Sequence, residues 1–172
     1  DIKRTNIPFE EMGNNIKNAT LAIEDKEFYN HGGVRITSTI RAIISNLSGF
    51  GIGGGGSTIT QQLIKNTLLT SKRSIIRKVK EWILAVKIEN ALTKDEIFEL
   101  YLNEVPYGGT VYGVEEASKT YFNKKAIDLT IAEAAYLAAI PQSPTRLSPF
   151  GKNLDKLEER KNLVLYQMYD AN

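Results

Sequence analysis

The segment LAIEDKEFYNHGG, residues 21–33, places a carboxylate among apolar side chains. On a helix, Leu21, Glu24 and Phe28 share one face, so Glu24 is flanked by apolar neighbours. Removing water from a carboxylate raises its pKa towards neutrality, as a general base requires. A glutamate at the rim of a core face, paired with a lysine or arginine, gives the same pattern, so both interpretations stay open. His31 precedes two glycines, and a structural hydrogen bond is as compatible with that position as catalysis is.

A group of cations follows further along the chain, around two expected helices: Lys65, Lys72, Arg73, Arg77, Lys78 and Lys80. Arg73, Arg77 and Glu81 are spaced four residues apart and therefore project from one helix face. Guanidinium and ammonium groups form charge-assisted bonds to phosphate oxygens, and a glutamate among them could hold a divalent ion. The spacing suits a diphosphate. The alternative is a solvated helix face with an Arg77–Glu81 ion pair.

A glycine run leads into a polar helix start in GGGGSTITQQLIKN, residues 53–66. Bare backbone amides and a helix N-terminus can together bind phosphate. A surface loop that precedes a capped helix would have the same sequence pattern, so this alternative stays open. The segment GFGIGG fits the spacing of a dinucleotide-binding loop, but a helix pattern precedes it where a strand is needed. Gly56 and Ser57 also lack the lysine of a Walker loop, so nucleotide binding is disfavoured.

Helical periodicity dominates and positions these groups. Helices are expected at residues 14–29, 36–47, 58–69, 73–91, 94–104, 112–120, 130–139 and 153–169. Three starts carry a capping box: Thr58 with Gln61, Thr93 with Glu96 and Thr130 with Glu133. In residues 74–91 an apolar stripe is expected to face the core; its members are Ile75, Ile76, Val79, Trp82, Ile83 and Val86. The pattern predicts one mostly α-helical domain over residues 1–172, with a mobile lobe at roughly 36–56.

Composition excludes several classes of protein. The 172 residues are 42% hydrophobic and 24% charged, which is typical of a globular domain with a core. The net charge of +2 argues against general nucleic-acid binding. The absence of cysteine and the single histidine exclude disulfides, thiolate sites and multi-histidine metal sites. No apolar run is long enough to span a membrane, and both chain ends are expected to be boundaries within a larger protein.

Five segments follow one another along the chain in this order: EDKEFYNHGG, GGSTITQQLIKN, RKVKE, KDEIFELYLN and ERKNLVL. Together they closely resemble the five motifs of the peptidoglycan glycosyltransferases, the family 51 domain of class A penicillin-binding proteins and monofunctional transglycosylases. The resemblance covers roughly residues 20–169. It implies a mostly α-helical, lysozyme-like fold, in which a large helical lobe and a smaller mobile, membrane-proximal jaw lobe flank a cleft.

The resemblance also implies a reaction and its residues. Lipid II would be polymerised into glycan strands, with inversion at the anomeric carbon and release of undecaprenyl diphosphate. Glu24 matches the family's base, and Glu81 matches the glutamate that organises the diphosphate, either directly or through Mg²⁺ or Mn²⁺; a cofactor requirement stays open. Substrate contacts carry over to Ser57, Gln62, Lys65, Arg73 and Lys78, with Asp25 and His31 around the base. Asn103 and Arg160 look mainly structural.

The implied partners are lipid II, the growing strand, the bacterial membrane and moenomycin-type inhibitors. The implied location is the extracytoplasmic face of the cell membrane, with an N-terminal anchor and a C-terminal transpeptidase domain outside this chain. Arg35 stands where the family commonly has aspartate, and Asn123 where it has glycine. Two alternatives stay open: a lysozyme-like glycan-cleaving enzyme, and a noncatalytic module that binds anionic lipid through Ile43, Ile44, Leu47, Phe50 and Ile52.

Overall fold

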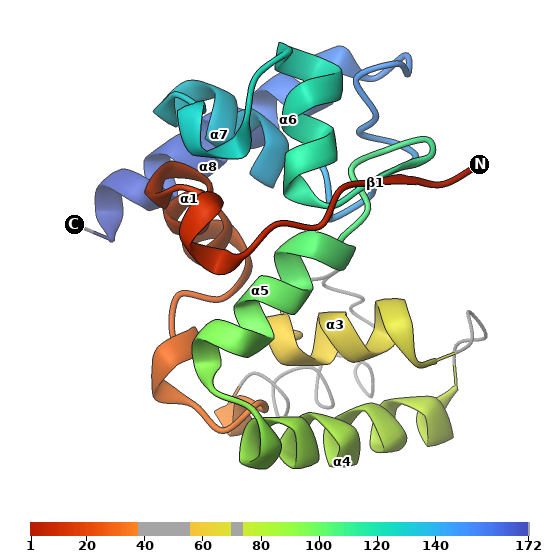
Figure 1. The fold of residues 1–172 in the computed structure, drawn as a ribbon. Helices are drawn as coiled ribbons and strands as arrows, with labels where there is room; N and C mark the ends of the chain where they lie inside the picture. The colour runs from red at the N-terminus through yellow and green to blue at the C-terminus, as the bar shows by residue number, and fades with distance from the viewer. Residues whose placement is uncertain (38–55, 70–73, 172) are drawn as a thin grey trace.

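The computed structural model describes residues 1–37, 56–69 and 74–171 (Figure 1). The chain is mostly helical, as expected. The α-helices are α1 (Asn14–Glu24), α3 (Ile59–Thr67), α4 (Ile75–Ala91), α5 (Lys94–Glu104), α6 (Val114–Phe122), α7 (Ile131–Ala138) and α8 (Leu154–Asp170). The 3-10 turns are η1 (Phe9–Glu11), η2 (Phe28–Asn30) and η3 (Ala126–Asp128), and the strands are β1 (Lys3–Arg4) and β2 (Val111–Tyr112).

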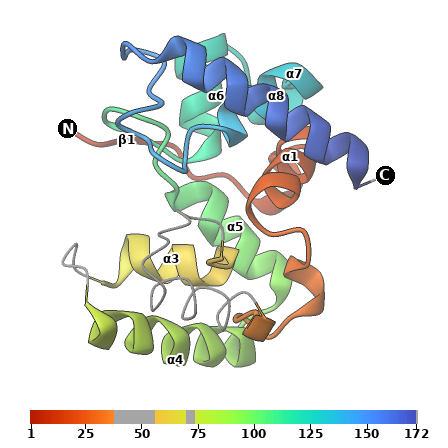
Figure 2. The same cartoon turned by 180° about the vertical axis from the view of Figure 1, so that it is seen from behind.

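The helices form two groups joined by α5. Helices α1, α7 and α8 pack against one another, with α6 against α7. On the other side α3 packs against α4 and α5 (Figures 1 and 2). Aromatic side chains of α5 and its surroundings fill the core between the groups, and Phe98, Tyr101 and Phe28 are almost completely buried. Helix α5 is therefore the common support of both groups.

The N-terminal segment runs along α5. Strand β1 pairs in parallel with β2, with Lys3 opposite Val111. Asn103 of α5 accepts a hydrogen bond from the backbone of Ile7 and donates one back to its carbonyl. Asn103 thus has the structural role expected of it.

Local sequence signals set most helix boundaries. All three expected capping boxes are present, with side-chain and backbone bonds in both directions. Asn123 ends α6 in the left-handed region at φ 53°. Asparagine tolerates this conformation better than most non-glycine residues, which explains how it can stand where the family has glycine.

Two expectations are wrong. Helix α1 ends at Glu24 and not at residue 29, because Asp25 leaves the helical conformation and its carboxylate bonds to other segments. The apolar stripe of α4 does not face the core. Helix α4 packs inwards through Glu81 and Ala85, whereas most of the stripe is exposed to solvent, namely Ile75, Ile76, Val79, Ile83 and Val86.

Some expectations lie outside the described residues. These include nearly all of the helix at 36–47, the glycines at 53–55, Arg73, and the apolar residues of the lipid-binding alternative. Among the residues that the structure describes, no helix is both long enough and apolar enough to cross a bilayer.

Candidate active site

Glu24 ends α1 and its side chain is only 11% exposed. Burial raises the pKa of this carboxyl above its usual value, and the hydrogen bond from Gln62 and the charges of Arg160 and Lys65 partly oppose that rise. The desolvation expected of Glu24 is therefore present, although Phe28 lies beyond the end of α1. A carboxylate in this environment is suited to accept a proton near neutral pH.

One oxygen of Glu24 is fixed by a chain of hydrogen bonds. Gln62 of α3 donates from Nε2 to Oε2 of Glu24 at 2.9 Å. The hydroxyl of Tyr101, on α5, donates to Oε1 of Gln62 at 3.3 Å. Because the tyrosine occupies the amide oxygen, the amide nitrogen is turned towards Glu24. Tyr101 was not among the expected site residues.

The second oxygen of Glu24 faces α8. Arg160 NH2 lies 3.6 Å from Oε1, as an ion pair between two largely buried side chains. Arg160 Nε donates to the carbonyl of Ala139 at 3.2 Å. Arg160 was expected to be mainly structural, but the structure also places its charge beside the candidate base. Its position in ERKNLVL was the one sequence signal that pointed to it.

Asp25 anchors the loop that follows the base. Its buried Oδ2 lies 2.7 Å from Nε2 of His31 and accepts the backbone amide of Ile59 at 3.1 Å. The amide of Gly33 donates to Nδ1 of His31, so the imidazole proton is on Nε2 and is donated to Asp25. Arg35 Nε also lies 3.8 Å from Asp25 Oδ1. Arg35 therefore adds an ion pair in the first motif.

A second network fastens this loop to three helices. Lys94 of α5 donates to the carbonyl of His31 at 2.6 Å and to Glu89 at 2.8 Å. Thr60 of α3 donates to the same oxygen of Glu89. Gly33, at φ +92°, is so close to α4 that a Cβ would lie 3.1 Å from the Ala85 carbonyl oxygen. Only glycine fits there, which explains why the loop carries it.

The cationic cluster lies between α3 and α4. Lys78 donates to Oγ of Ser57 at 2.9 Å and to Oε1 of Glu81 at 2.5 Å. Glu81 is almost fully buried. Desolvation lowers the pKa of Lys65, and the charge of Lys78 lowers it further. The carboxylates of Glu81 and Glu24 oppose this effect and raise the pKa. The charge of Lys65 therefore interacts with both glutamates, Glu24 and Glu81. Of the expected site residues, only Arg73 lies outside the described residues.

These residues do not by themselves fit a resident metal ion. In the described ranges, no group of three or more histidine, aspartate or glutamate side chains could hold one. Glu81 is a single carboxylate, and its Oε1 already accepts the Lys78 ammonium. Divalent cations prefer several oxygen ligands, and nearby ammonium groups repel them. No chemical step is therefore assigned to a metal.

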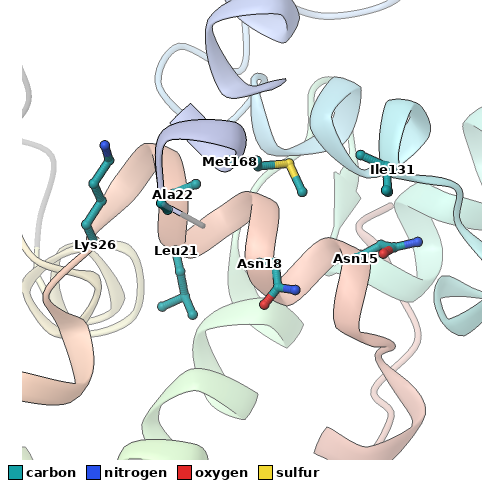
Figure 3. Close-up of a pocket in the computed structure, with 8 residues that line it drawn as sticks. Asn15, Asn18, Leu21, Ala22, Lys26, Ile131 and Met168 are labelled. Atoms are coloured by element: carbon teal, nitrogen blue, oxygen red, sulfur yellow. The ribbon is translucent and has the colours of Figure 1, made fainter. Parts of the chain in front are cut away.

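A pocket of about 310 Å³ lies elsewhere, along the side of α1 that faces Met168 of α8 and Ile131 of α7 (Figure 3). None of the expected site residues lines it. The residues that do are Asn15, Asn18, Leu21, Ala22, Lys26, Ile131, Met168 and Ala171. The candidate active site is therefore defined by the Glu24 network and the cationic cluster, not by this pocket.

A family model described as Transglycosylase matches residues 1–169. The chain belongs to the transglycosylase family, and the resemblance to the glycosyltransferase domain of class A penicillin-binding proteins is confirmed.

Similar relatives include penicillin-binding protein 1A of Rickettsia bellii, 43% identical over 171 residues, and penicillin-binding protein 1F of Bacillus subtilis, 42% identical over 167 residues. The alignments cover 98% and 97% of this chain but only 22% and 23% of these relatives. The crystal structure of penicillin-binding protein 1A from Haemophilus influenzae matches 98% of this chain and 15% of that chain, with a TM-score of 0.55 and 23% identity. This likeness supports the mostly α-helical fold.

Proposed function

We propose that this domain is a peptidoglycan glycosyltransferase that polymerises lipid II into glycan strands. The observation that carries the proposal is the pairing of one buried carboxylate, Glu24, with a separate cationic cluster of Lys65 and Lys78. An alcohol nucleophile at neutral pH needs a base, whereas a diphosphate leaving group needs charge neutralisation and hardly any protonation. The two parts of the site match these two needs.

In the proposed reaction, the 4-hydroxyl of lipid II gives its proton to Glu24 as its oxygen attacks the anomeric carbon of the growing strand. The bond from that carbon to the diphosphate oxygen breaks, and undecaprenyl diphosphate leaves with the electron pair. Lys65, Lys78 and the hydroxyl of Ser57 would stabilise the leaving charge. Glu24 then releases its proton to solvent. Direct displacement of an α-linked donor gives a β linkage.

The glycan-cleaving alternative is less well supported by the residues. Glycosidases generally use two carboxyl groups, one of which protonates the departing alkoxide. Glu81 is poorly suited to donate a proton, because its carboxylate is held by the Lys78 ammonium. An enzyme that cuts neutral sugars also has little use for the cations of α3 and α4.

We also propose that α4 faces the extracytoplasmic surface of the cell membrane. Its exposed apolar stripe, with Lys80 and Lys87 exposed on the same helix, has the composition of a helix that lies on a lipid surface. Helix α4 lies at the edge of the molecule farthest from α7 and α8 (Figure 1). Contact of α4 with lipid would bring the cationic cluster close to a lipid-linked diphosphate.

Incubation of the domain with purified lipid II tests the proposal. Long glycan strands that contain β linkages, together with released undecaprenyl diphosphate, are expected, and a moenomycin-type inhibitor should block their formation. Cleavage of preformed strands into small products would support the glycan-cleaving alternative. Binding of lipid II without any product would support the noncatalytic module.

A further inference from the structure

Among the described residues, Arg160 is the one member of α8 whose side chain makes a polar contact with the candidate base. Its side chain is 15% exposed, and the NH2 group lies 3.6 Å from Oε1 of Glu24. The Nε–H group of the same guanidinium is held by the carbonyl of Ala139. A planar guanidinium with one edge fixed to the backbone presents its remaining N–H groups in a fixed direction.

The groups around Glu24 come from several elements. Gln62 and Lys65 approach from α3, Tyr101 from α5 and Arg160 from α8, while Asp25 follows in the chain. Asp25 raises the pKa of Glu24, and the other charged groups lower it. Burial and the charge of Glu24 both raise the pKa of Tyr107. Oε2 is thus held by an amide, and within the described ranges Arg160 is the cation paired with Oε1.

We propose that Arg160 is a positioning residue for the base: it orients Oε1 of Glu24 and keeps the buried carboxylate ionised at neutral pH. This inference rests on the proposed function, in which Glu24 is the base. A cation within about 4–6 Å of a carboxylate favours its charged form by roughly 1–3 pK units. Without that charge, burial would favour the protonated acid, which cannot accept a proton.

The guanidinium accounts for both parts of this role. Its Nε–H is bound to Ala139, so the charge cannot swing away as a lysine ammonium could. Lysine at this position would keep the charge but lose the fixed fork. Charge and orientation can therefore be separated by two substitutions.

The test is the pH dependence of lipid II polymerisation in Arg160→Met and Arg160→Lys, with Lys156→Met as the matched control on the exposed face of α8. For Arg160→Met, the acidic limb of kcat/KM should move upwards by about one pH unit or more, so that the rate deficit is at least about tenfold larger at low pH than at high pH. Arg160→Lys should keep an acidic limb near that of the wild type but show a lower plateau. An acidic limb unchanged in Arg160→Met would overturn the proposal, as would an equal deficit at every pH.

A second measurement does not depend on activity. Urea unfolding of the wild type, Arg160→Met, Glu24→Gln and the double variant gives the coupling between the two side chains. Arg160→Met should cost less stability in the Glu24→Gln background at pH 8, and the coupling should shrink when Glu24 is protonated. Additive costs at pH 8 would overturn the ion pair, and so would a coupling that does not change with pH.

Different results would contradict the proposed function and the role of Arg160. If the wild type polymerises lipid II and Glu24→Gln does not, the proposed function stands whatever Arg160 does. If the wild type makes no glycan strands, the unfolding cycle still measures the contact between Arg160 and Glu24. If Arg160→Met does not fold, the plateau and acidic limb of Arg160→Lys decide the outcome: wild-type values for both would overturn the orienting role.

Discussion

The carboxylate of Asp25 accepts a hydrogen bond from the backbone amide of Ile59 at 3.1 Å. This bond joins the end of α1 to the first turn of α3. The candidate base Glu24 and its amide partner Gln62 lie on these two helices, so the Asp25 bond helps to fix their relative placement. The same oxygen of Asp25 binds His31, so the loop that follows Glu24 is held against the start of α3.

Asp25→Asn should weaken this junction. In asparagine one carboxylate oxygen is replaced by an NH2 group, which donates hydrogen bonds and does not accept them. At either position this NH2 group would face another donor or the Arg35 cation. We expect a loss of about 1–3 kcal/mol in the free energy of unfolding, measured with urea. Asp155→Asn, at an exposed position on α8, is the matched control. Wild-type stability in Asp25→Asn would contradict the anchoring role.

Glu24→Gln should remove the base without removing the diphosphate site. A positioned base contributes about 10²–10⁴-fold to the rate, so polymerisation should fall by that factor or more. Affinity for a moenomycin-type inhibitor should change little, because Lys65 and Lys78 remain. The exposed Glu27→Gln serves as control. Polymerisation at the wild-type rate in Glu24→Gln would refute the assignment.

The same substitution should stabilise the protein. Burial raises the pKa of Glu24 in the folded state. The stability that this group contributes is therefore present below the usual glutamate pKa, and it is lost as the pH rises through the pKa of the folded state. Glutamine has no charge to bury. Near pH 7 the variant should therefore be more stable than the wild type. The difference in Tm should narrow towards pH 4; a constant difference would exclude this cause.

Lys78→Met should weaken binding of the diphosphate. Lys78 connects Ser57 to the buried carboxylate of Glu81, and its loss leaves that carboxylate without its ammonium partner. We expect binding of a lipid-linked diphosphate to weaken by roughly tenfold to a hundredfold, as lost charge-assisted bonds typically do. Lys119→Met, at an exposed position on α6, should bind as the wild type does. Calorimetry on both variants decides between a local and a general charge effect.

Replacing Ile76 and Ile83 together with asparagine should reduce membrane binding. Both side chains are exposed on α4, 70% and 52%, and would lose contact with lipid acyl chains. Binding to vesicles that contain anionic lipid should fall by about tenfold or more, on the usual free energy of burying apolar area. Leu100→Asn, exposed on α5, is the control. Equal binding by all three proteins would argue against α4 as the lipid-facing helix.

Sequence reasoning succeeded where the signal was local. A threonine followed three residues later by glutamate or glutamine identified the starts of α3, α5 and α7, because the capping box is complete within one turn. The desolvation of Glu24 was also expected, and its burial is confirmed, although Phe28 lies in η2 and does not share a helix face with Glu24.

It failed where the outcome depended on distant segments. The stripe of α4 shows that the helix is amphipathic, but periodicity cannot tell which face the rest of the protein covers, and here the buried face carries Glu81 and Ala85. The end of α1 was missed because Asp25 is drawn out of the helix by partners far along the chain. The contact between Arg160 and Glu24 likewise joins α8 to α1, and no local pattern reports it.

The Oε1 atom of Glu24 is buried, and among the described residues it has no hydrogen-bond partner, since Arg160 lies beyond hydrogen-bond distance. A buried acceptor without a donor costs about 1–3 kcal/mol, which an incoming hydroxyl would recover. The carboxylate would then select its substrate as well as activate it. A lipid II analogue without the 4-hydroxyl should bind as an acceptor roughly tenfold to a hundredfold more weakly, and so be a poor chain terminator.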